Sequence, residues 1–168
     1  IRRARGRQGR VSDLDAQPRE SRCGPGTDAG PVVRDYPVRE VPLGGVRGVT
    51  VHRALPQRAL PTVGAWCFLD RFGAPADSGV RTDIDPHPHI GLQTVSWLLA
   101  GEIRHRDSLG SDVRIRPGQL NLMTAGSGIA HSERTPDAQR ASGQKMLGLQ
   151  SWIALPKGKE EIAPTFQH

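Results

Sequence analysis

The chain has 168 residues, enough for one domain of ordinary size. Its formal net charge is +6, but five arginines fall within the first ten residues and the remainder is nearly neutral, so we expect no direct nucleic-acid binding. No stretch approaches the roughly 18 apolar residues of a membrane-spanning helix, and two cysteines make no disulfide framework, so we expect a cytoplasmic protein without membrane contact.

Residues 1–35 differ in composition from the rest of the chain. They are rich in Arg, Gly, Pro, Asp and Ser, and their apolar residues follow neither the strand period nor the helix period. We expect a disordered or loosely attached basic tail there. The folded domain is expected over residues 36–156.

Short apolar runs alternate with Gly- and Pro-containing turns throughout that domain. Strands are expected at 48–53, 66–72, 94–99, 102–106, 113–116, 120–123 and 146–155. The last of these fits either one long strand or a pair of strands. No segment of a dozen residues shows a helical stripe. This pattern predicts an all-β protein, an antiparallel sandwich or barrel.

Two short motifs carry the clearest chemistry. His87-Pro88-His89 and His131-Ser132-Glu133 each place two metal-binding side chains at positions i and i+2. On a strand, such residues point to the same face. Proline lacks a backbone donor, so Pro88 favours a strand at the edge of a sheet. Three imidazoles and one carboxylate would suit a transition metal. The alternative is that these are ordinary surface or core histidines, and the pattern alone leaves both readings open.

Four longer segments resemble the pirin family of the cupin superfamily, in particular its N-terminal domain. They span residues 64–73 (GAWCFLDRFG), 87–95 (HPHIGLQTV), 101–110 (GEIRHRDSLG) and 123–133 (MTAGSGIAHSE). The resemblance implies a cupin-type double-stranded β-helix, a jelly-roll barrel. It further implies one metal held by His87, His89, His131 and Glu133. Fe(II) is expected there, with Zn, Cu, Ni and Mn as alternatives.

The resemblance also implies two functions. One is a dioxygenase of the quercetin 2,3-dioxygenase type, which opens a flavonol or a related aromatic enol, with Glu133 as both metal ligand and catalytic base. The other is a non-enzymatic, iron-dependent redox sensor that binds a protein partner. Gln93 stands where general cupins and many pirins carry glutamate. Since pirins normally have two such domains, residues 157–168 are expected as a linker toward an absent or truncated second one.

Other residues invite simpler expectations. His105 and Asp107 are expected at a polar hairpin end, with the orientation of a metal ligand as the alternative role. Trp66 and Trp97 are expected in the core or in a cavity wall. Cys67 is expected to be buried, and Arg134 to be solvated.

Overall fold

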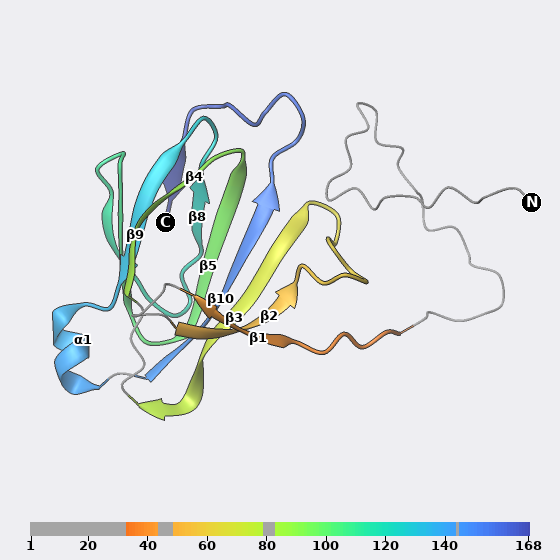
Figure 1. Ribbon diagram of the computed structural model, residues 1–168. Helices are drawn as coiled ribbons and strands as arrows, with labels where there is room; N and C mark the ends of the chain where they lie inside the picture. The colour runs from red at the N-terminus through yellow and green to blue at the C-terminus, as the bar shows by residue number, and fades with distance from the viewer. Residues whose placement is uncertain (1–32, 44–48, 79–82, 144) are drawn as a thin grey trace, which may run out of the picture. The chain divides into compact units, whose positions relative to one another are not determined.

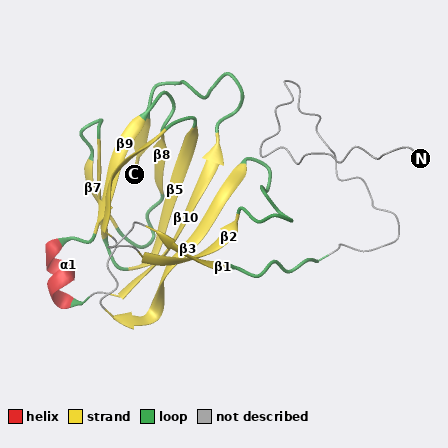
Figure 2. Ribbon diagram, in the orientation of Figure 1, coloured by secondary structure: helices red, strands yellow, loops and turns green. Residues whose placement is uncertain are grey.

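The computed structural model describes residues 33–43, 49–78, 83–143 and 145–168. The tail expected over residues 1–35 lies almost entirely outside these ranges. The strands are β1 (Arg39–Leu43), β2 (Val49–Leu55), β3 (Trp66–Ser78), β4 (Asp83–His89), β5 (Leu92–Ala100), β6 (Ile103–Asp107), β7 (Asp112–Ile115), β8 (Asn121–Thr124), β9 (Ile129–Arg134), β10 (Lys145–Ala154) and β11 (Thr165–Gln167). A six-residue helix, α1 (Asp137–Ser142), lies between β9 and β10 (Figure 2). The all-β prediction is confirmed.

The strands form two antiparallel sheets (Figure 1). The larger has the order β1-β2-β3-β10-β5-β8-β11, and the smaller has the order β4-β9-β6-β7. β4 is therefore an edge strand, as Pro88 indicated, and its two prolines at positions 86 and 88 are both exposed. Residues 145–154 form one long strand, β10, which pairs with β3 on one side and β5 on the other.

The hydrophobic core joins the two sheets. Phe72, Leu98 and Met146 from the larger sheet are buried together with Ile103 and Ile115 from the smaller one. The burial of each such side chain stabilises the folded state by about 1.5–3 kcal/mol. β5 shows why its sequence fits this place: Thr94, Ser96 and Leu98 alternate inward and are buried.

The outer face of the larger sheet carries apolar side chains that we expected inside. Trp97 is 37% exposed and Trp66 is 43% exposed, and both line an apolar groove on that face with Leu120. The expectation of a core position is therefore wrong for both tryptophans, which line a groove on the surface instead. Cys67 is half-buried, and its thiol donates to the carbonyl oxygen of Trp152. Burial raises the pKa of this thiol, against the lowering effect of backbone hydrogen bonds.

The segment expected as a linker, residues 157–168, includes the edge strand β11 of the larger sheet. Residues 157–161 are exposed, but β11 pairs with β8 through Thr165↔Thr124 and Phe166↔Met123. The loop before β11 is also tied to the turn between β8 and β9, because the Ser127 N–H donates to the Ile162 carbonyl oxygen at 2.9 Å. This segment thus belongs to the same unit, Tyr36–His168.

No helix among the described residues is long and apolar enough to cross a membrane.

Candidate metal centre

The two histidine motifs lie on neighbouring strands of the smaller sheet. β4 pairs with β9 so that His87 is directly opposite His131, and His89 is opposite Ile129. Because alternate residues share a face, His87, His89 and His131 all point to the same side of the sheet. The i, i+2 spacing thus brings His89 beside His87, and the cross-strand pair brings His131 beside His87.

The three imidazoles form a tight group. One ring nitrogen from each of His87, His89 and His131 lies within 4.8 Å of the other two. Their ring centroids are 4.5–5.1 Å apart: 4.9 Å for His87 and His89, 4.5 Å for His87 and His131, and 5.1 Å for His89 and His131. Within the described part of the chain, this is the group with the composition and spacing of a metal site.

The hydrogen bonds leave nitrogen lone pairs available in this group. The Nε2 atoms of His89 and His131 are buried and bind no protein group. Nδ1 of His87 lies 2.9 Å from the carbonyl oxygen of Asp85, which can only accept, so Nδ1 is the donor and the neutral ring keeps its lone pair on Nε2. Buried polar atoms without a partner are costly, and a metal ion would satisfy them.

The electrostatics favour neutral imidazoles. Burial, together with the nearby His87, lowers the pKa of His89 to about 4. Burial lowers the pKa of His131 to about 2, with further lowering from His87, His89 and His105. Histidine binds a metal in its neutral form, so His89 and His131 would not have to release a proton before they bind a metal at neutral pH.

Glu133, the fourth expected ligand, does not belong to this three-histidine group. It lies on the same face of β9 as His131, and its carboxylate accepts hydrogen bonds from Gln150 Nε2 at 3.2 Å and Ser96 Oγ at 3.4 Å. The side chain is buried, and burial raises the pKa of its carboxyl group despite those donors and nearby histidines. Gln93 donates its side-chain amide N–H to the Thr124 hydroxyl oxygen at 2.9 Å.

A buried pair of residues lies behind His131. His105 Nε2 is 3.0 Å from the Asp107 carboxylate, and the Nδ1 atoms of His105 and His131 are 3.5 Å apart. Burial acts to raise the pKa of Asp107, but hydrogen bonds from His105, Ser111 and Leu109 outweigh it and lower the pKa. The alternative role, orientation of a ligand, therefore fits the geometry better than a simple hairpin end.

Aromatic side chains surround the histidine group, and the sequence did not indicate them as part of the site. The Trp152 ring lies 5.2 Å from His89 at a steep angle, and it stacks on Phe68 at 4.1 Å. Phe166 of β11 stacks on His105, also at 4.1 Å. Trp152 and Phe68 were visible only as members of apolar runs, and Phe166 lay in the expected linker.

Comparison with known proteins agrees with this geometry. The family model described as Pirin matches residues 48–153. A Pseudomonas aeruginosa protein, provisionally named as a quercetin 2,3-dioxygenase, is 51% identical over 132 residues, which is 77% of this chain and 40% of that protein. A pirin-like protein from Caulobacter vibrioides is 50% identical over 121 residues, 70% of this chain and 42% of its own length. The chain thus spans about two-fifths of these relatives.

A solved structure shares the fold. The crystal structure of a quercetin 2,3-dioxygenase from Acinetobacter baumannii has a TM-score of 0.71 and 47% sequence identity, and the match covers 79% of this chain and 43% of that one. This likeness confirms the cupin-type jelly-roll prediction. On the family model and the histidine geometry together, the chain belongs to the pirin family of the cupin superfamily.

Proposed function

We propose that the chain binds one divalent transition metal through His87, His89 and His131, with Glu133 as the fourth ligand. The observation that supports this most directly is the convergence of three imidazoles, two of which hold buried Nε2 atoms without a protein partner. Such a set suits Fe, Zn, Cu or Ni better than the hard cations Mg and Ca. We take Fe(II) as the native metal, with Zn, Cu, Ni and Mn as alternatives.

We further propose that the loaded protein is a dioxygenase of the quercetin 2,3-dioxygenase type. Bound Fe(II) would supply the electron-transfer chemistry that reaction with O2 requires. Glu133 would accept the hydroxyl proton of the flavonol, and its hydrogen bonds to Gln150 and Ser96 hold the carboxylate in place for that role. The stacked rings of Trp152 and Phe68 give the site an apolar wall against which a planar aromatic substrate could pack.

The metal assignment is tested by the variants His89→Ala and Glu133→Ala. Each should lose most of the metal that the wild-type protein retains after Fe(II) loading without oxygen, as measured by elemental analysis. His52→Ala serves as the control, because His52 lies on β2 and does not belong to the histidine group. Full metal retention in both variants would show that the ligands are elsewhere.

The activity is tested separately on the same preparations. Loaded wild-type protein should consume quercetin and O2 together, followed by loss of the visible absorbance of quercetin and by an oxygen electrode. Free Fe(II) at the same concentration provides the background. Metal retention without turnover above that background would contradict the dioxygenase assignment while it left metal binding intact.

A further inference from the structure

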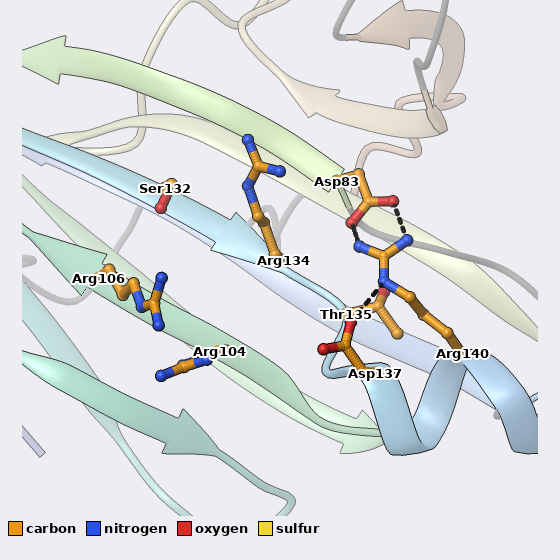
Figure 3. A pocket seen from close by; sticks show the side chains of 8 residues that line it. All are labelled: Asp83, Arg104, Arg106, Ser132, Arg134, Thr135, Asp137 and Arg140. Carbon is orange, nitrogen blue, oxygen red and sulfur yellow. Dashed lines mark hydrogen bonds and ion pairs between the residues drawn. The ribbon is translucent and has the colours of Figure 1, made fainter.

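A second group of charged residues lies on the opposite side of the strands that carry the histidines. β6 and β9 point His105, His131 and Glu133 inward, so the residues next to them along each strand point to the opposite face. These outward side chains line a polar groove of about 390 Å³, which Figure 3 shows from close by. A volume of this size suits a small ligand. The groove shares strands with the metal centre and none of its ligands.

The register of the strands brings like charges together in this groove. Arg104 of β6 is directly opposite Arg134 of β9, and it is also directly opposite Arg114 of β7. Directly opposed like charges destabilise a pair of strands. Arg114 is paired with Glu102 at 3.2 Å and lies outside the groove, so the opposition of Arg104 and Arg134 is the part that an anion in the groove would relieve.

A small residue completes the arrangement. Arg106 is directly opposite Ser132, so Arg104, Arg106, Ser132 and Arg134 occupy two adjacent cross-strand pairs on one face. Directly opposed side chains start about 5 Å apart, and neighbours along a strand start about 7 Å apart. Serine leaves space in the groove that these arginines line, where a longer side chain would fill it. Its hydroxyl makes no hydrogen bond to the described residues and is available to a ligand.

The carboxylates nearby neutralise the arginines unevenly. Asp112 accepts two bonds from Arg104, both at 2.7 Å, and one from Arg106 at 3.2 Å, so two cations share one anion. Arg134 uses one Nη2 donor on Asp85 at 2.5 Å. Each guanidinium carries five N–H donors, and several of them on Arg106 and Arg134 therefore have no partner in the described structure.

At the other end of the groove, carboxylates neutralise the arginine. Arg140 of α1 forms a two-pronged ion pair with Asp83, and Asp137 lies beside it (Figure 3). An anion would meet two carboxylates there. The uncompensated donors are thus confined to the end formed by Arg104, Arg106 and Arg134.

We propose that Arg104, Arg106, Arg134 and the Ser132 hydroxyl bind a phosphate group, either free phosphate or the phosphate of a small phosphomonoester. Arginine donors fit the oxygens of phosphate in pairs, and a dianion would offset the charge that Asp112 leaves uncompensated. The inference does not depend on the metal or on the proposed oxygenase activity.

The test is a titration of the full chain with inorganic phosphate, followed by ³¹P NMR line broadening at constant ionic strength, with chloride as the balancing anion. Binding should be saturable. Arg106→Gln combined with Arg134→Gln should weaken it at least about tenfold, as expected when charged hydrogen bonds are lost. A control variant, Arg58→Gln, removes one exposed cation from the loop after β2 and should leave the affinity unchanged.

A second test uses a variant that should bind phosphate more tightly, because poor folding of a variant cannot produce that result. Asp112→Asn removes the carboxylate shared by Arg104 and Arg106, so it should tighten phosphate binding severalfold. Phenyl phosphate then separates the two sources of the ligand: tighter binding than inorganic phosphate indicates a phosphomonoester, and equal binding indicates free phosphate. Weaker phosphate binding in Asp112→Asn, or equal line broadening in the double variant and the wild type, would overturn the proposal.

Discussion

Nδ1 of His131 lies 3.5 Å from Nδ1 of His105, whose other ring nitrogen binds the Asp107 carboxylate at 3.0 Å. This contact uses the Nδ1 side of His131 and leaves its Nε2 atom for a metal. The pair thereby fixes both the orientation of the His131 ring and the nitrogen that it offers. Asp107 itself is fixed by the N–H groups of Leu109 and Ser111, which both donate to its other oxygen.

Asp107→Asn should therefore weaken metal binding without removing any ligand. Asparagine keeps an acceptor oxygen for the Leu109 and Ser111 N–H groups but presents an amide NH2 group, a donor, to His105 Nε2 where Asp107 offers an acceptor oxygen. Loss of such outer partners typically costs about 10- to 100-fold in metal affinity. Competition titration with a chromophoric chelator and Ni(II) measures the change.

Asp137→Asn is the matched control, because Asp137 is fully exposed on α1 and lies outside the histidine group. If Asp107→Asn and Asp137→Asn bind Ni(II) equally well, His131 does not depend on the buried pair for its orientation.

Gly126→Ala should destabilise the protein strongly. Gly126 has φ of 52°, and a Cβ atom there would overlap the backbone carbonyl group of Ile162. The left-handed conformation alone costs a non-glycine residue about 1–2 kcal/mol, and displacement of the Ile162 loop adds to that. The Ser127 to Ile162 hydrogen bond would also be disturbed. Thermal unfolding measures the effect, at about 2–4 °C per kcal/mol for a chain of this size.

Gly118→Ala separates the two costs. Gly118 has φ of 84°, but nothing lies within 4 Å of a Cβ atom placed there, so only the conformational cost applies. We expect a smaller loss of about 1–2 kcal/mol. Equal destabilisation by the two substitutions would show that the loop before β11 does not press against the turn at Gly126.

The ion pairs on the outer face should make stability depend on pH in the acid range. The hydrogen bonds and charge of Arg104, with help from Arg106, lower the pKa of Asp112 to about 2 from its ordinary value of 3.8. A lowered folded-state pKa stabilises the fold above the ordinary value, and this contribution is lost as pH falls toward 2. The wild type should thus be more stable than Asp112→Asn at pH 5, with the difference gone near pH 2.

Denaturant unfolding at several pH values measures that difference. Because Asp112 and Arg104 are both exposed, the difference should be small and should shrink as salt is added. A difference that stays constant from pH 5 to pH 2 would mean that the charge of Asp112 has no part in it.

Most of the fold could be predicted from local pattern. Leu92–Ala100 is rich in β-branched and apolar residues, and Asp112–Ile115 alternates, so both could be identified as strands. β11 could not, because Thr165–Gln167 is too short to show a period and is a strand only through its pairing with β8. The tryptophans show a different limit: alternation indicates that Trp97 and Leu98 face opposite sides of β5, but it does not say which side is buried, and Leu98 is the buried one.

The candidate metal site also has residues that the sequence indicated and residues that it did not. The i, i+2 spacing placed His87 with His89 on one face, and the resemblance joined them to His131, 42 positions after His89. For Asp107 the sequence offered orientation of a ligand only as an alternative, since Asp107 is brought opposite His131 by the pairing of β6 with β9. The role of Gln150 could not be predicted. Gln150 reaches Glu133 from the other sheet, a contact set by sheet packing rather than by any local pattern.

The alternation along β9 has a consequence for how this chain can evolve. Odd-numbered positions 131 and 133 carry the proposed metal ligands, while even-numbered positions 132 and 134 line the polar groove. Substitutions at the even positions can change the specificity of the outer face while the inner chemistry is retained. An insertion or deletion of one residue within β9 would instead exchange the two sets at once and abolish both, so this strand should tolerate replacement far better than changes in length.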